Sequence, residues 1–201
     1  MRTSMVQAVL AVLVGVACSD SVTAPVTTWY ATLSVANETP APTGTSTLGG
    51  TVTVVATGGG TGQGTITYSI ALTGTPTSTI TAAHIHSAAA GVTGLVRVNL
   101  CGTNAVTASA TQPGSQPATP ACPTGAGGDI SGQPVTYTLG STNVLGCTLN
   151  TAGTACASNQ LTFDALVTAL RAYGAYAQVH TSTNTAGEVR GQLLPAATGT
   201  P

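Results

Sequence analysis

Hydrophobic and polar residues alternate along several short stretches of this chain, and a period of two predicts β-strands. In residues 65–72 the hydrophobic positions all fall on one face, and the positions between them hold threonine, serine and alanine. Because successive side chains of a strand point to opposite faces, we expect this hydrophobic face to pack inward. The stretches with a comparable pattern are residues 29–36, 51–56, 80–86, 95–100, 135–139, 176–180 and 188–194. Short strands separated by glycine-containing turns predict an all-β fold, an antiparallel Greek-key-like β-sandwich.

One segment has the spacing of a helix instead. Thr162 is a suitable N-cap, and Gly174 is a suitable terminator. Between them, apolar residues recur at i, i+3, i+4 and i+7 and form one stripe: Phe163, Leu166, Val167 and Leu170. We therefore predict one short helix, packed on the edge of the sandwich.

The start of the chain predicts export. Residues 1–17 contain an arginine and then a short apolar run, which is typical of a signal peptide and too short to span a bilayer comfortably. Cys18 follows Ala17 directly, and this resembles a bacterial lipoprotein signal in which the cysteine is lipidated; ordinary secretion is the alternative. We expect a signal peptide at 1–17, an anchor cysteine and tether at 18–28, and a domain at 29–195. The expected location is the bacterial outer membrane, cell surface or periplasm.

The remaining cysteines suggest two disulfides, because an even number is usual in exported proteins. Three pairings of Cys101, Cys122, Cys147 and Cys156 are possible. We favour Cys101–Cys122 with Cys147–Cys156, since these pairs close the shortest loops. They would staple a long loop insertion at about residues 102–160, which is rich in proline, glycine, serine and threonine.

Charge is scarce in this chain. Charged residues make up 4% of the sequence, lysine is absent, and the formal net charge is −1. This composition lacks the basic patch expected of a nucleic-acid-binding protein. Near-neutral surfaces favour association, so self-association is one expectation and an unidentified envelope partner is another.

Three motifs carry a resemblance to a known family. They are residues 33–40, which contain Glu38; the Ala83-His84-Ile85-His86 run with the strand at 95–100; and residues 176–181 followed by 187–193. In this order and spacing they resemble the CHRD domain over about residues 29–194. The resemblance implies a β-rich sandwich similar in general form to immunoglobulin-like or copper/zinc superoxide dismutase-like folds. It implies no particular reaction or ligand.

All three histidines of the chain lie in these motifs. His84 and His86 are two positions apart, so both rings project from one face of a strand, and His180 follows another strand. Three neutral imidazoles would suit copper or zinc. The favoured alternative is a buried polar cluster that also includes Glu38, Arg97, Glu188 and Arg190, because buried charges must be paired. In that cluster Glu188 could pair with Arg190 or His180.

Catalytic motifs are weak in this sequence. It contains no Gly-x-Ser-x-Gly elbow, and Asp20, Asp129 and Asp164 lie in the tether, the long loop and the helix start. We therefore expect a non-catalytic cell-envelope binding or structural module rather than an enzyme. The alternatives are a copper- or zinc-binding metalloprotein, with superoxide dismutase-like chemistry as a possible activity, and a self-associating envelope or matrix component.

Overall fold

The computed structural model describes residues 27–58, 64–102, 119–123, 135–140, 148–149, 156–157 and 161–196. Its strands are β1 (Thr28–Ser34), β2 (Gly49–Gly58), β3 (Gly64–Thr73), β4 (Ile80–Ser87), β5 (Leu95–Gly102), β6 (Val135–Gly140), β7 (Thr148–Leu149), β8 (Cys156–Ala157), β9 (Tyr176–Thr181), β10 (Val189–Gln192) and β11 (Leu194–Pro195). A 3-10 turn, η1 (Val35–Asn37), follows β1, and the helix α1 (Phe163–Arg171) precedes β9.

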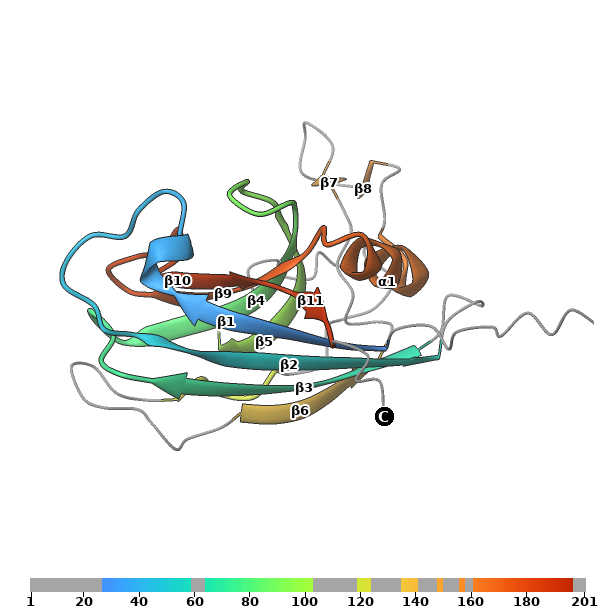
Figure 1. Ribbon diagram of the computed structural model, residues 1–201, viewed down its shortest axis with the longest axis horizontal. Coiled ribbons are helices and arrows are strands. Elements are labelled where there is room, and N and C mark those ends of the chain that lie inside the picture. Colours follow the sequence, from blue (N-terminus) through green and yellow to red (C-terminus); the bar gives the residue numbers. More distant parts are fainter. Residues whose placement is uncertain are drawn as a thin grey trace, which may run out of the picture.

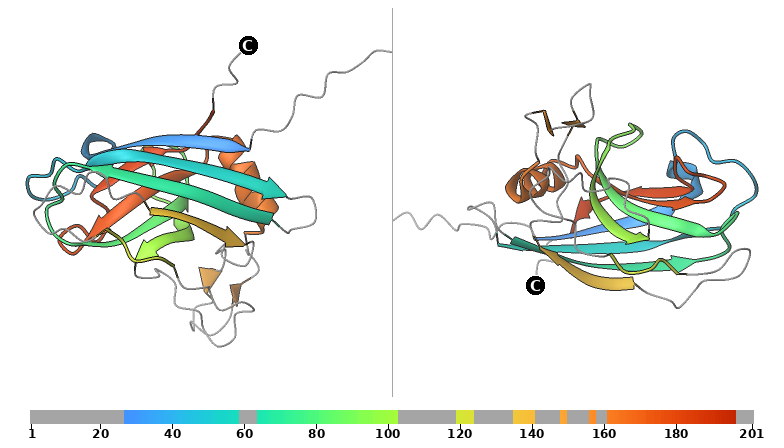
Figure 2. Two further views of the ribbon diagram at one scale, coloured as in Figure 1. Left: turned by 90° about the horizontal axis from the view of Figure 1, so that it is seen from below. Right: turned by 180° about the vertical axis from the view of Figure 1, so that it is seen from behind.

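The main sheet is antiparallel and coils back on itself. Its strand order is β5-β4-β9-β10-β1-β2-β3-β6, and β11 pairs with β1. Strand β1 meets β10 only at Ser34 and Arg190, and its other end pairs with β11. The sheet therefore splits into two layers, one of β5, β4, β9 and β10 and one of β1, β2, β3 and β6, as Figures 1 and 2 show. The predicted all-β antiparallel fold is confirmed, as a nearly closed barrel or sandwich.

The core lies between the two layers. The predicted inward face of β3 is confirmed, since Ile66, Tyr68, Ile70 and Leu72 are all buried. The hydroxyl of Tyr68 donates to the carbonyl of Leu100, which joins β3 to β5 across the core. Burial of this apolar surface is the main force that holds the layers together.

Helix α1 lies at one end of the barrel, beside β11 (Figure 1). The predicted N-cap is confirmed, because Thr162 Oγ1 accepts a hydrogen bond from the Ala165 amide at 3.1 Å. Phe163 packs against the first residue of β3. A Cβ atom at Gly64 would lie 2.2 Å from the Phe163 ring, so glycine is required for this contact.

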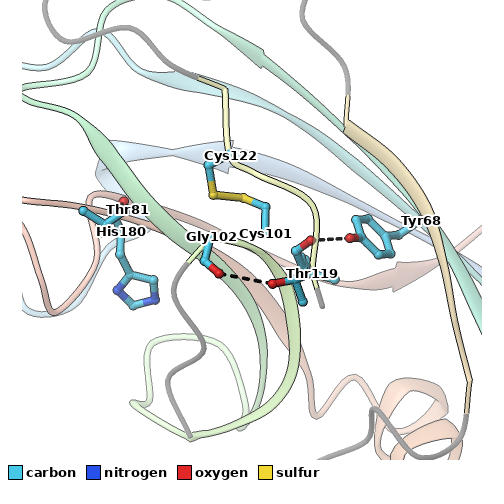
Figure 3. Close-up of a disulfide and its surroundings, with 8 residues drawn as sticks. Tyr68, Thr81, Cys101, Gly102, Thr119, Cys122 and His180 are labelled. Carbon is cyan, nitrogen blue, oxygen red and sulfur yellow. Dashed lines mark hydrogen bonds between the residues drawn. A yellow bond between two sulfur atoms is a disulfide. The ribbon is translucent and has the colours of Figure 1, made fainter. Parts of the chain in front are cut away.

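The predicted disulfide Cys101–Cys122 is confirmed and ties the segment 119–123 to β5 (Figure 3). The second predicted disulfide stays a prediction, because Cys147 lies outside the described residues. The predicted signal peptide and Cys18 also lie outside them. Within the described part of the chain, no helix has the length and apolar character needed to cross a membrane.

Candidate metal centre

Strand β9 is buried on both faces, and this explains where the polar motif residues lie. All six of its residues are buried. Ala177 and Val179 belong to the hydrophobic core, so the alternation places Tyr176, Gln178 and His180 on the outer face of the layer. Side chains on this face would be solvated in an ordinary antiparallel sheet, so other parts of the chain must cover them.

Three connecting segments form that cover. They are η1 with the residues after it, the β4–β5 loop and the β9–β10 loop, which rise on the same side of the sheet in Figure 1. Each makes a hydrogen bond to a side chain of the face: Gln178 Nε2 donates to Glu38, His86 contacts the Gly94 carbonyl, and His180 contacts the Thr185 carbonyl. We call the residues under this cover the outer polar layer. Its members are Glu38, His84, His86, Tyr176, Gln178, His180 and Arg190.

The sheet brings the three histidines together. In the β4–β9 register, His84 lies opposite Gln178, His86 opposite Tyr176 and His180 opposite Ala82. One ring nitrogen from each histidine can be chosen so that all three lie within 4.8 Å of one another. The predicted same-face projection of His84 and His86, and their proximity to His180, are therefore found in the structure.

Backbone carbonyls orient two of these rings. Nδ1 of His86 lies 3.0 Å from the Gly94 carbonyl oxygen, and Nδ1 of His180 lies 3.0 Å from the Thr185 carbonyl oxygen. Because a carbonyl only accepts hydrogen bonds, each Nδ1 carries the proton and donates it. In the neutral ring the lone pair is then on Nε2. Both Nε2 atoms are buried and have no hydrogen-bond partner among the described residues.

The surroundings keep these two rings neutral. Burial lowers the pKa of His86 to about 4, and the Gly94 hydrogen bond only partly opposes this effect. Burial also lowers the pKa of His180. At neutral pH the rings therefore present lone pairs rather than protons at Nε2, which is the form that ligates a metal.

Arg190 and Glu38 complete the outer polar layer. The Arg190 Nε donates to the Asn37 carbonyl at 2.7 Å and lies 3.6 Å from the Glu38 carboxylate. Burial raises the pKa of Glu38, although hydrogen bonds from Gln178 and the Thr39 amide and the charge of Arg190 oppose this effect.

The predicted pairing of Glu188 with Arg190 or His180 is wrong. Gly187 has a φ of 129° and turns the chain just before β10, so Glu188 does not follow the alternation of that strand. Its carboxylate is fully buried and accepts hydrogen bonds from four residues: Ser46, Thr77, Thr181 and Asn184. Burial alone would raise the pKa of Glu188, but the hydrogen bonds from Ser46, Thr77 and Thr181 outweigh it and hold the pKa below its ordinary value.

Arg97 also lies apart from the predicted cluster. Its Nε donates to Ser87 Oγ at 2.7 Å, and it forms no ion pair with any residue in the described ranges. The predicted single polar cluster is therefore three separate arrangements: the outer polar layer, the Glu188 network and the Arg97–Ser87 contact.

The sequence reasoning missed two residues of the layer. The Tyr176 ring stacks on His86 with centroids 4.9 Å apart and 10° between the planes, and the Arg190 guanidinium carbon lies 5.0 Å from the Tyr176 ring centroid. Gln178 links Glu38 to the strand. Both residues alternate with His180 along β9. Recognising that this strand is buried on both faces would have identified them as members of the layer.

A cleft of about 340 Å³ opens beside the stack. Its lining includes Asn37, Gly91, Tyr176, Arg190 and Gln192, and none of the three histidines lines it. The cleft therefore reaches Tyr176 and Arg190 but not the imidazole nitrogens.

These features define a class of protein: an antiparallel β-barrel or sandwich module with a covered polar layer on one outer face. The chain belongs to the CHRD family, because the family model of the CHRD domain matches residues 29–193. Neither the curated proteins nor the solved structures contain a match. CHRD domains occur in extracellular proteins and are not known as enzymes, and the family is one of binding modules.

Proposed function

We propose that this chain is a non-catalytic binding module of the bacterial envelope and that it binds a transition-metal ion through His84, His86 and His180. One observation carries the proposal: three buried imidazoles converge, with ring nitrogens within 4.8 Å of one another. Nitrogen ligands of this kind suit copper and zinc.

The two backbone carbonyls support this proposal over a purely structural role. Metal-ligating histidines usually donate their second ring N–H to a carbonyl or carboxylate, which fixes the tautomer and the ring orientation. His86 and His180 have such anchors at Nδ1, while their Nε2 atoms are buried and have no hydrogen-bond partner in the part of the chain that the structure describes. A buried polar atom without a partner costs about 1–3 kcal/mol. A bound ion would remove that cost at both atoms.

Metal content of the purified full protein tests the proposal. After loading with copper or zinc and exhaustive dialysis, we expect one ion per chain. The chain has three histidines in all, so no other histidine contributes to the signal. We expect the variants His86→Gln and His180→Gln to lose the ion.

Gln178→Leu is the matched control, because it alters a side chain of the same layer that is equally buried but supplies no imidazole. It should retain the ion. Circular dichroism must show that each variant is folded. Absence of metal in the folded wild-type protein, or equal retention by the histidine variants, would refute the metal site.

The envelope location is part of the same proposal. The apolar leader followed by Cys18 supports lipid anchoring, and an anchored module would present its metal site outside the cytoplasm. We expect Cys18→Ala to move the protein from the membrane fraction to the soluble fraction. Unchanged fractionation would count against the anchor and leave the metal site unaffected.

A further inference from the structure

We infer that the three-histidine site is selective for monovalent copper, Cu(I), and that Arg190 acts as its selectivity residue against divalent ions. This inference rests on the proposed function. It concerns which ion the outer polar layer accepts, and it follows from the charges around the imidazoles.

Within the part of the chain that the structure describes, no anionic ligand accompanies the histidines. The group of side chains in the described residues that could hold an ion contains His84, His86 and His180 alone. Glu38 is directed to Gln178, the Thr39 amide and Arg190, and Glu188 is held by its own hydroxyl and amide donors. An ion bound by three neutral imidazoles would therefore keep its full charge.

That charge would be buried. The three histidines are 4%, 5% and 8% exposed, and the Nε2 atoms of His86 and His180 are among the buried atoms. The free energy of transferring an ion from water into a protein interior is large, and in the Born description it grows with the square of the charge. A divalent ion thus incurs about four times the desolvation cost of a monovalent ion of the same size.

Arg190 adds a fixed positive charge nearby. Its guanidinium lies over the Tyr176 ring, and the same ring stacks on His86, so the charge is one aromatic ring away from a ligand. The Arg190 side chain is 4% exposed, and a guanidinium stays charged at every physiological pH. Glu38 compensates this charge only in part, because its carboxylate lies 3.6 Å from Nε and the Nη2 atom has no hydrogen-bond partner among the described residues.

The number of ligands points the same way. Cu(I) is satisfied by few ligands, whereas structural zinc is almost always four-coordinate, with three protein ligands and a water in catalytic sites. Within the described ranges, no fourth side chain of a ligating type joins the three histidines. The neighbouring cleft is lined by Tyr176 and Arg190 and not by the histidines.

Competition titrations of the full protein test this inference. Under anaerobic conditions, Cu(I) is offered in competition with bicinchoninate, and in separate samples Zn(II) is offered in competition with a colorimetric zinc chelator. We expect one Cu(I) per chain, bound more tightly than Zn(II). In Arg190→Gln, the loss of one nearby charge should raise the Zn(II) affinity on the order of tenfold more than the Cu(I) affinity. Arg190→Lys should keep the wild-type ratio.

Arg171→Gln is the control, since Arg171 is an exposed residue at the end of α1 and its charge is screened by solvent. It should change neither affinity. If Arg190→Gln does not fold, Glu38→Gln serves instead, because removing the compensating negative charge should weaken Zn(II) more than Cu(I).

The outcomes separate the two proposals. Folded protein that retains neither ion overturns the metal site itself. Tighter binding of Zn(II) than of Cu(I) overturns the selectivity and leaves the metal site standing. If the ratio of Zn(II) affinity to Cu(I) affinity in Arg190→Gln, or in Glu38→Gln where that variant replaces it, equals the wild-type ratio, the role of Arg190 is overturned.

Discussion

At the scale of single residues, most of the buried polar atoms without a hydrogen-bond partner in the described residues lie in one place; Trp29 Nε1, in the hydrophobic core, is an exception. Glu38 Oε2, His86 Nε2, His180 Nε2 and Arg190 Nη2 are all buried, and none has a hydrogen-bond partner among the described residues. All four belong to the outer polar layer. Buried polar groups in native proteins are nearly always satisfied by protein, water or an ion, so this concentration supports the proposed binding site. Glu188 shows the opposite situation, because donors surround its carboxylate.

Glu188 gives a prediction about stability and pH. Its pKa is lowered in the folded protein from an ordinary value of 4.5, so its contribution to stability is present above about pH 4.5 and is lost as the pH falls through the folded-state pKa. Glu188→Gln should lower the free energy of unfolding at pH 7 by about 2 kcal/mol, because hydrogen bonds to a charged group are replaced by weaker ones.

Urea denaturation of wild type and Glu188→Gln at pH 7 and pH 3 measures this effect. The difference between the two proteins should shrink at pH 3, because this pH lies below the ordinary value of 4.5 and the carboxylate of the unfolded chain is then protonated. An equal difference at both pH values would mean that the carboxylate charge contributes nothing to the free energy of unfolding.

At the scale of elements, the site depends on how three loops cover one face of β4, β9 and β10. The strands themselves could be predicted from the sequence, because a period of two is a local signal: the predicted strand at 65–72 is β3 (Gly64–Thr73), and the predicted helix after Thr162 is α1. Which loop covers which face depends on contacts between residues far apart in the chain. The hydrogen bond from Gln178 to Glu38 spans 140 residues, and no local pattern encodes it.

A substitution at Gly187 tests how much the covering loops contribute to metal binding. Its φ of 129° disfavours any other residue, and a Cβ atom there would lie 2.0 Å from Gln178 Nε2 and 2.7 Å from a Glu38 carboxylate oxygen. We therefore expect Gly187→Ala to displace the β9–β10 loop, expose the histidines and weaken metal binding.

Gly91→Ala is the comparison variant, because Gly91 also has a positive φ of 76° but has no atom within 4 Å of an added Cβ. It carries the backbone strain without the steric clash. Metal dissociation rates of the two variants compare the effects. Similar rates would show that backbone strain is responsible, and not displacement of the β9–β10 loop, whose Thr185 carbonyl orients His180.

At the scale of the whole molecule, the fold contains two separate buried regions that differ in polarity. Between the layers lies the apolar core, and outside one layer lies the covered polar layer with its histidines. The sequence predicted the convergence of His84, His86 and His180 because all three sit in the family motifs. It misplaced Glu188 and Arg97, because the geometry of the turn at Gly187 and the local contact with Ser87 are set only in three dimensions. Self-association and the second disulfide stay predictions.

The most direct test of the metal site is a long-range ¹H–¹⁵N NMR spectrum of the imidazoles, recorded on the full protein before and after addition of Zn(II) or Cu(I), both diamagnetic. The chain has only three histidines, so each ring can be assigned. We predict that the metal-free spectra show His86 and His180 as neutral rings protonated at Nδ1, and that the metal shifts their Nε2 resonances while Nδ1 stays protonated. Nε2 resonances unchanged at saturating metal, in a protein whose backbone spectrum is folded, would contradict the assignment of this layer as a metal centre.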